Sequence, residues 1–248
     1  MNGSLPPGFF AVLPTSTPRC FTGRSGDGAC SRNRDRAFHA PRLGLIIRHD
    51  RHDPFLGDDA DNPGDGHWAS TVFLDRDGVI NRRIEGDYVR GWSQFEFLPG
   101  AIDAIARLTL VADRIVVVTN QAGVGKGLMS MADLEEIHAR MTAMVAAGGG
   151  RIDGVFACPH TPADRCNCRK PATGLGEQAR ATLPDVDFAR SVLVGDGTSD
   201  IAFGRALGMR TILVGPGLDH DPCPDADGRA PDLPRATDLL VGDWLRRA

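Results

Sequence analysis

The feature that most constrains the fold is an alternation of short apolar runs with longer amphipathic runs, which begins near Ser70. The apolar runs have the length of buried strands and lie at 71–74, 114–119, 154–157, 191–194 and 210–214. Runs with helical length and periodicity lie at 99–110, 174–183, 199–207 and 237–247. Strands that alternate with helices pair in parallel and carry helices on both faces. The sequence therefore predicts an α/β fold, a Rossmann-like parallel sheet covered by helices.

One further helix is predicted from its first residue. Ser130 has the side chain preferred at an N-cap, and three glycines at 148–150 end the periodic stretch that follows. The apolar residues that share one face of this helix are Leu134, Ile137, Met141, Met144 and Val145. We expect all five to face the core.

Residues 1–69 differ in texture from the rest of the chain. They are rich in Pro, Gly, Arg and Asp and show no sustained periodicity, so they cannot bury enough apolar surface to offset their ordering entropy. We predict a disordered N-terminal extension at 1–69, or translated sequence upstream of the true start, with a functional tail as the alternative. The folded domain is predicted at 70–248.

Charge and hydropathy exclude some classes of protein. The formal net charge is −4, whereas a general nucleic-acid binder needs a basic face. No apolar run approaches the length of a transmembrane helix, and the apolar piece at 9–13 lacks the basic flank of a signal peptide. We expect a cytoplasmic monomer with no nucleic-acid and no membrane partner.

Polar residues follow the C-terminal ends of four predicted strands. They are Asp75 and Asp77, Thr119 and Asn120, Arg169 and Lys170, and Asp196 with Asp200 one turn later. Ligands of open α/β sheets bind beyond these strand ends, so we expect the side chains to converge at one edge. Carboxylates, a hydroxyl and a lysine are the groups that phosphoryl transfer requires.

Other interpretations of these motifs are weaker. Asp75-x-Asp77-Gly resembles part of a calcium loop, but Phe73 and Ile84 stand where that loop needs acidic residues. A polar turn without chemistry is the remaining alternative, and the other strand-end residues argue against it.

The glycine-rich run at 121–127 resembles a nucleotide-binding loop, but it does not match the P-loop pattern. Gly127 follows Lys126 where Ser or Thr is required. We interpret the run as a flexible active-site loop with Lys126 near an anionic substrate.

A cluster of soft ligands lies between the third predicted strand and Lys170. Cys158, His160, Cys166 and Cys168 supply three thiols and an imidazole, which is a ligand set for tetrahedral zinc. Four protein ligands leave no open position, so the zinc would be structural. The alternatives are chance proximity or redox-active thiols. The remaining cysteines, Cys20, Cys30 and Cys223, are expected to be free thiols.

Together these motifs resemble the haloacid dehalogenase superfamily of phosphatases, in particular its heptose-bisphosphate and histidinol-phosphate phosphatases. The resemblance covers about 71–215. It rests on the segments 73–81, 118–121, 158–171 and 194–196. No room exists between the motifs for a large cap domain, which implies a minimal cap, a zinc-binding loop and a small substrate.

The resemblance implies a role for each site residue. Asp75 would be the nucleophile that forms an aspartyl phosphate, and Asp77 the general acid and then the base. Magnesium would be bound by Asp75, by the backbone carbonyl of Asp77 and by Asp196. The groups implied around the phosphate and the sugar are Thr119, Asn120, Gln121, Arg169, Lys170, Glu85, Asp87 and Tyr88, of which Arg169 would meet a second phosphate.

The sequence departs from the family pattern in two places. Val79 replaces the usual Thr, and the segment 170–175 reads Lys-Pro-Ala-Thr-Gly-Leu instead of Lys-Pro-x-Pro-Gly-Met.

The activity that the resemblance implies is magnesium-dependent hydrolysis of the 7-phosphate of a heptose 1,7-bisphosphate, in the synthesis of nucleotide-activated heptose. Hydrolysis of histidinol phosphate or of another small phosphorylated metabolite is the first alternative. A zinc-stabilised binding module without catalysis is the second.

Overall fold

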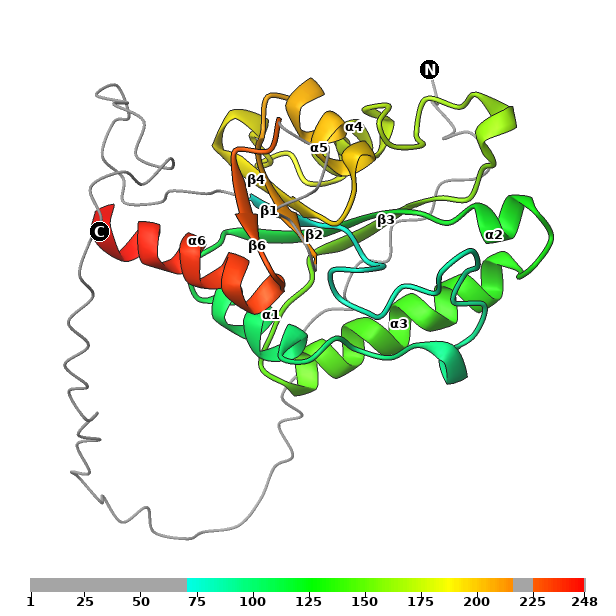
Figure 1. Ribbon diagram of the computed structural model, residues 1–248, viewed down its shortest axis with the longest axis horizontal. Helices are drawn as coiled ribbons and strands as arrows, with labels where there is room; N and C mark the ends of the chain where they lie inside the picture. The colour runs from blue at the N-terminus through cyan, green and yellow to red at the C-terminus, as the bar shows by residue number, and fades with distance from the viewer. Residues whose placement is uncertain (1–70, 216–224, 248) are drawn as a thin grey trace, which may run out of the picture.

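The structure is a computed structural model that describes residues 71–215 and 225–247. It forms three layers, with a parallel sheet between two sets of helices (Figure 1). The sequence-based prediction of an α/β parallel sheet is therefore confirmed. The expectations for residues 1–69 and for Cys20, Cys30 and Cys223 lie outside the described residues.

Six strands form the sheet in the order β3-β2-β1-β4-β5-β6, and every pair is parallel. Their bounds are Thr71–Leu74, Arg114–Asn120, Gly154–Cys158, Ser191–Gly195, Arg210–Val214 and Gly228–Ala230 for β1 to β6. The five predicted strands are all present. The edge strand β6 was not predicted, because three residues that include a glycine and an arginine carry no strand signal.

The helices divide between the two faces of the sheet. Figure 1 shows α1, α3 and α6 on one face, and α4 and α5 on the other. The bounds of α1 to α6 are Ala101–Thr109, Ala122–Gly125, Met131–Ala147, Gly174–Thr182, Thr198–Ala206 and Leu233–Arg247. Helix α6 begins four residues before the predicted start, with Pro234 in its first turn, where a missing backbone N–H costs nothing. Short 3₁₀ turns occur at Trp92–Gln94, Pro162–Asp164 and Phe188–Arg190.

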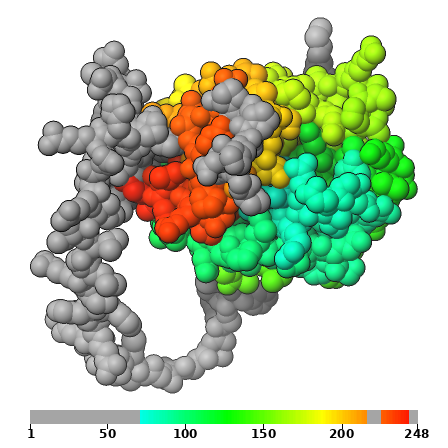
Figure 2. All heavy atoms as spheres, viewed as in Figure 1, coloured from blue at the N-terminus to red at the C-terminus, as the bar shows by residue number. Residues whose placement is uncertain are grey.

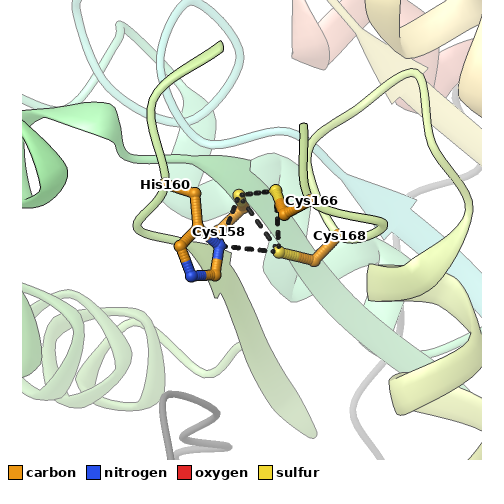
Figure 3. A group of neighbouring side chains, drawn as sticks. All are labelled: Cys158, His160, Cys166 and Cys168. Atoms are coloured by element: carbon orange, nitrogen blue, oxygen red, sulfur yellow. Dashed lines mark hydrogen bonds between the residues drawn. The ribbon is translucent and has the colours of Figure 1, made fainter. Parts of the chain in front are cut away.

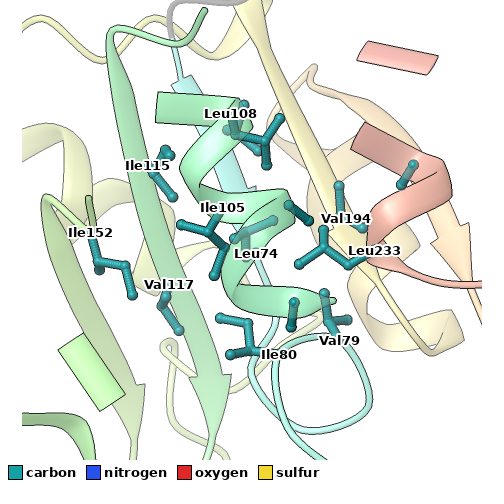
Figure 4. Close-up of a cluster of buried hydrophobic side chains, with 14 of the residues drawn as sticks. Leu74, Val79, Ile80, Ile105, Leu108, Ile115, Val117, Ile152, Val194 and Leu233 are labelled. Atoms are coloured by element: carbon teal, nitrogen blue, oxygen red, sulfur yellow. The ribbon is translucent and has the colours of Figure 1, made fainter. Parts of the chain in front are cut away.

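The core has one part on each side of the sheet, because side chains alternate along a strand. Leu74 of β1 packs with Ile105 of α1 and Val117 of β2 on the first side, as Figure 4 shows. Phe73 points to the opposite side and packs with the residues of α4 and α5. Both faces of β1 are buried, so its four residues are fully enclosed and hold the centre of the sheet rigidly.

Helix α3 begins where its capping residue predicts. The Ser130 hydroxyl accepts a hydrogen bond from the backbone N–H of Asp133 at 3.1 Å, and the Asp133 carboxylate accepts one from the backbone N–H of Ser130 at 2.8 Å. The buried face is narrower than predicted, however. Met144 is 45% exposed, because it lies about 100° around the helix from its buried neighbour Val145.

The order of the strands determines where a ligand can bind. The chain moves outward from β1 to β2 and β3, then returns to the other side of β1 with β4. The boundary between β1 and β4 is thus the switch point at which open α/β sheets leave a crevice. The segment after β1, cyan in Figure 2, is part of the molecular surface on the face shown. None of the helices within the described ranges is both long and apolar enough to span a bilayer.

Candidate active site and metal centre

A cavity of about 720 Å³ opens at the C-terminal edge of the sheet. Its carboxylates are Asp75, Asp77, Glu85, Asp87, Asp196 and Asp200. Its cations are Arg83, Lys126, Arg169 and Lys170. This volume lies within the usual range of small-molecule sites, and the walls combine charges of both signs. The convergence predicted from the strand ends is present.

Asp75 lines the cavity directly after β1. Its backbone N–H donates to the carbonyl of Val194 at 2.9 Å, which ties it to β4. Burial raises the pKa of Asp75 to about 7, the carboxylates of Asp200 and Asp196 add to the rise, and the Lys170 ammonium opposes it. The ionised form, which a nucleophile needs, therefore depends on cations close to Asp75.

Lys170 is one of these cations, and it is almost completely buried. Its ammonium lies 2.7 Å from an oxygen of Asp75, 2.5 Å from one of Asp200 and 2.8 Å from the carbonyl oxygen of Val118. Burial lowers its pKa, but the two carboxylates outweigh that effect and raise the pKa above the ordinary value. Lys170 is thus a permanent positive charge beside Asp75.

Asn120 holds the backbone of Lys170 in place. Its side chain accepts from the Lys170 N–H at 3.0 Å and donates to the Lys170 carbonyl at 3.1 Å. Asn120 is the last residue of β2 and also lines the cavity, so it connects the strand to the loop that carries the lysine.

Three carboxylates form a compact group at the switch point. One oxygen each of Asp75, Asp196 and Asp200 lie within 4.8 Å of one another. Burial raises the pKa of Asp196, and the neighbouring charge of Asp200 adds to this, whereas Arg83 opposes it from 2.8 Å. Hard divalent cations prefer such oxygen ligands, so the residues present fit magnesium.

One detail of this carboxylate group goes beyond the sequence-based prediction. Asp200 was placed one turn after Asp196 but was given no role, although its carboxylate completes the group. The side chain of Asp77 does not join it. Gly78 allows Asp196 to approach closely: its φ is +93°, and a Cβ there would collide with the Asp196 carboxylate.

The Asp77 carboxylate is held by three donors. Arg76 Nη2 donates to both oxygens at 3.0 and 2.9 Å, and Asn81 Nδ2 donates at 2.9 Å. Gln121 Nε2 donates at 2.6 Å. Burial raises the pKa of Asp77, but the charge of Arg76 and these hydrogen bonds outweigh it and hold the pKa below its ordinary value. The carboxylate is therefore ionised and fixed in orientation.

Gln121 lies behind the site and not on its wall. It is fully buried, and its Nε2 also donates to the Thr119 hydroxyl at 2.9 Å. The side chain of Gln121 thus contacts Asp77 and Thr119, and it is not among the residues that line the cavity, where the predicted contact with the substrate would lie. Thr119 itself lines the cavity.

The remaining predicted substrate residues belong to the same cavity. Glu85, Asp87, Tyr88 and Arg169 all line it. Asp87 is paired with Arg90 at 2.7 Å, and the ammonium of Lys126 lies 5.2 Å from the centre of the Tyr88 ring. Arg83 also lines the cavity and was missed, since an arginine in a charged loop carries no signal of its own.

The cysteine cluster forms a second candidate metal site, drawn in Figure 3. The Sγ atom of Cys158 lies 3.6 Å from that of Cys166 and 3.2 Å from that of Cys168, and His160 Nδ1 lies 3.2 Å from Cys168 Sγ. Donor atoms around one tetrahedral zinc lie roughly 3.5–3.8 Å apart. The thiols are free and nearly at this spacing, so the four residues fit a structural zinc ion.

The cluster is coupled to the active site through the backbone. Cys158 ends β3 beside Asn120 of β2, and its carbonyl accepts from the Gln121 N–H at 2.7 Å. Cys168 lies two residues before Lys170. The loop closed by this cluster is therefore the loop that carries Arg169 and Lys170.

Comparison with known proteins points to one family. A family model for haloacid dehalogenase (HAD)-hydrolase-like proteins matches residues 167–243. The chain is 52% identical over 137 residues to the D-glycero-alpha-D-manno-heptose-1,7-bisphosphate 7-phosphatase of Mycobacterium tuberculosis H37Rv, a match that covers 55% of this chain and 71% of the relative. It is 38% identical over 143 residues to the D-glycero-beta-D-manno-heptose-1,7-bisphosphate 7-phosphatase of Neisseria meningitidis MC58, covering 58% and 75%.

Solved structures agree with these relatives. The fold is similar to the crystal structure of D,D-heptose 1,7-bisphosphate phosphatase from B. bronchiseptica in complex with magnesium and phosphate. The TM-score is 0.65 at 35% identity, and the match covers 70% of this chain and 99% of the other. The corresponding enzyme from Burkholderia thailandensis gives a TM-score of 0.52 at 33% identity, covering 69% and 98%.

Proposed function

The chain belongs to the haloacid dehalogenase-like phosphatases, and we propose that it hydrolyses the 7-phosphate of a D-glycero-D-manno-heptose 1,7-bisphosphate with the help of magnesium. The observation that carries the proposal is the contact of Asp75 with the buried ammonium of Lys170, in a cavity of sugar-phosphate size. The named relatives add the substrate class. The product would feed the synthesis of nucleotide-activated heptose.

In the first step, a carboxylate oxygen of Asp75 attacks phosphorus, and the bond from phosphorus to the sugar oxygen breaks. An aspartyl phosphate forms on Asp75, and Asp77 gives its proton to the leaving sugar oxygen. The Lys170 ammonium, with Thr119, offsets the charge on the phosphoryl oxygens. The product of this step is the free sugar hydroxyl.

Asp77 must hold a proton before it can act as an acid. Arg76, Asn81 and Gln121 keep its pKa low in the substrate-free molecule. The entering phosphate brings negative charge next to Asp77, and a like charge raises the pKa of a carboxyl group. Proton uptake is thus linked to substrate binding.

In the second step, Asp77 acts as the base. It takes a proton from a water molecule, which attacks phosphorus and releases phosphate from Asp75. The donors around Asp77 suit this half of the reaction, because they favour its ionised form between turnovers.

Magnesium would be held by the carboxylates of Asp75, Asp196 and Asp200 and by the backbone carbonyl of Asp77, where it would stabilise the negative charge of the phosphoryl group. Asp200 is added to the predicted ligand set because its carboxylate lies with the other two. Lys170 lies between Asp75 and Asp200, and its positive charge favours the ionised form of Asp75 that would bind the ion.

The second phosphate of the substrate would be met by Arg169 and by Lys126, which lines the same cavity. Histidinol phosphate is the competing substrate, and it would need free carboxylates for its ammonium group. Asp87 is already paired with Arg90, which leaves Glu85 as the free carboxylate of this loop. Arg169 and Lys126 therefore outnumber the one unpaired carboxylate of this loop, which favours a bisphosphate.

The test is phosphate release from heptose 1,7-bisphosphate of both anomers, heptose 7-phosphate and histidinol phosphate, each with magnesium and with a chelator. We expect a magnesium-dependent reaction with the highest kcat/KM on a bisphosphate. Arg169→Gln should reduce the difference in kcat/KM between the bisphosphate and the monophosphate. Turnover that persists in chelator, or a preference for histidinol phosphate, would overturn the proposal.

A further inference from the structure

Arg76 is the largest fully buried side chain among the described residues. It lies between Asp75 and Asp77, the two carboxylates of the proposed reaction, and it points into the protein. A buried guanidinium is costly unless its N–H groups find acceptors. The acceptors of Arg76 therefore decide where this side chain can rest.

Its two terminal nitrogens bind different elements. Arg76 Nη2 donates to both oxygens of Asp77, and Arg76 Nη1 lies 3.1 Å from Nε2 of His138. His138 is 3% exposed and belongs to the buried face of α3, next to Ile137 and one turn after Leu134. A single guanidinium thus connects the middle of α3 to the Asp77 carboxylate.

The direction of the contact follows from the chemistry of arginine. Every nitrogen of the guanidinium is a donor, so Nε2 of His138 must be the acceptor and the ring proton must lie on Nδ1. Burial, together with the positive charge of Arg76, lowers the pKa of His138 to about 3. The imidazole is therefore neutral at any working pH and is a constant acceptor.

We propose that His138 is a positioning residue for Asp77: it anchors one end of the Arg76 guanidinium, so that the other end holds the Asp77 carboxylate toward the leaving oxygen. This inference rests on the proposed function. Without His138, Nη1 would be a buried donor with no partner. The guanidinium would then turn toward another acceptor, and Asp77 would keep only Asn81 and Gln121 as donors.

The loss of this anchor should affect some substrates more than others, according to how much the leaving oxygen needs a proton. Protonation of the leaving oxygen matters for an alkoxide, which is a poor leaving group, and little for p-nitrophenolate. The value of kcat/KM covers the steps up to the formation of the aspartyl phosphate, so a misplaced Asp77 lowers kcat/KM for a sugar phosphate much more than for p-nitrophenyl phosphate. A general loss of structure would lower both values equally.

The experiment compares wild type, His138→Leu and His138→Gln on heptose bisphosphate and on p-nitrophenyl phosphate. Leu fills the space without an acceptor, whereas Gln carries an amide oxygen at nearly the reach of Nε2. We expect His138→Leu to lose about 10-fold or more in kcat/KM on the sugar and no more than about 3-fold on the aryl phosphate, a part of the 10²–10⁴-fold that a general acid supplies. His138→Gln should restore the ratio.

An unchanged ratio of the two kcat/KM values in His138→Leu would overturn the inference while the proposed function stands. A wild type that releases no phosphate from either compound would overturn both. Thermal melts by circular dichroism show whether each variant folds. If the Leu variant does not fold, His138→Asn takes its place: it keeps an amide but is one methylene shorter than Gln, so it should lose the ratio that Gln keeps.

Discussion

The proposed reaction depends most directly on Asp75, and the amide variant of this residue separates chemistry from folding. In Asp75→Asn the side chain keeps its shape but loses its nucleophilicity. We expect turnover to fall below detection, because spontaneous hydrolysis of phosphate monoesters is slower by up to about 10²¹-fold. The fold should remain, since Lys170 keeps Asp200 and the Val118 carbonyl as partners. A phosphate-release assay checks the loss of turnover, and a thermal melt checks that the fold remains. Near-normal turnover would contradict the mechanism.

Arg83 balances the carboxylate group from the exposed side. It pairs with Asp196 at 2.8 Å, although its side chain is 56% exposed. A cation at this place competes with magnesium for Asp196, so Arg83→Met should bind magnesium more tightly. Exposed ion pairs contribute about 0–1 kcal/mol, which limits the gain to roughly fivefold.

Arg82 provides a matched control for the Arg83 variant. Arg82 is the preceding residue, and its change to Met removes the same positive charge. It pairs with Glu96 and does not line the cavity. Titration calorimetry with magnesium on the metal-free proteins should show a tighter Kd for Arg83→Met and little change for Arg82→Met. Equal or weaker binding in the Arg83 variant would show that the pair with Asp196 does not compete with the ion.

Among the elements, the loop from β3 to α4 carries the second metal prediction. Cys158, His160, Cys166 and Cys168 close this loop, and Lys170 follows it directly. Purified protein should contain about one zinc ion per chain. Cys166→Ser should lose the zinc and lower kcat without touching the reacting groups, because metal binding and local folding are one free-energy change.

Two controls distinguish a structural zinc from a catalytic metal. Added magnesium should not rescue Cys166→Ser, since a hard cation prefers oxygen ligands. Cys20→Ser removes a cysteine that the sequence pattern leaves outside the cluster, and it should keep both zinc and activity. Elemental analysis and phosphate release measure the outcome. A wild type without zinc, together with a fully active Cys166 variant, would show that packing alone holds the loop.

At the scale of the whole molecule, the described residues already contain every part of the proposed site. The cavity is lined by residues between Asp75 and Asp200, and β1 begins at Thr71. Deletion of residues 1–69 should therefore change kcat/KM by less than about twofold and leave the thermal midpoint nearly unchanged, as the lack of sustained periodicity in that segment predicts.

Deletion of residues 1–74 is the matched control. It also removes β1, which pairs with both β2 and β4 at the centre of the sheet, and we expect no folded protein. A large loss of stability or activity on deletion of 1–69 alone would show that this segment packs on the domain. The expected monomeric state remains a prediction, which sedimentation of either form would measure.

The sequence by itself determined the layered fold, because the periodicity of apolar residues and the length of each apolar run are local properties of the chain. It also determined which residue types meet at the carboxyl edge, since parallel strands all end there. Asp75, Asp196 and Lys170 could be found in this way, and so could the cluster of three cysteines and His160, whose ligands are close along the chain.

The tertiary structure decided which polar groups touch. Asp200 and Lys170 are 30 residues apart, yet they form the tightest ion pair of the site, and no local pattern encodes that contact. Gln121 looked like a substrate residue but is turned inward to hold Asp77. His138 sits on an apolar helix face that predicts only core packing, and its partner Arg76 comes from a strand end 62 residues away. Side-chain direction and long-range contact depend on the packing of whole elements, so they follow from the folded molecule and not from sequence periodicity.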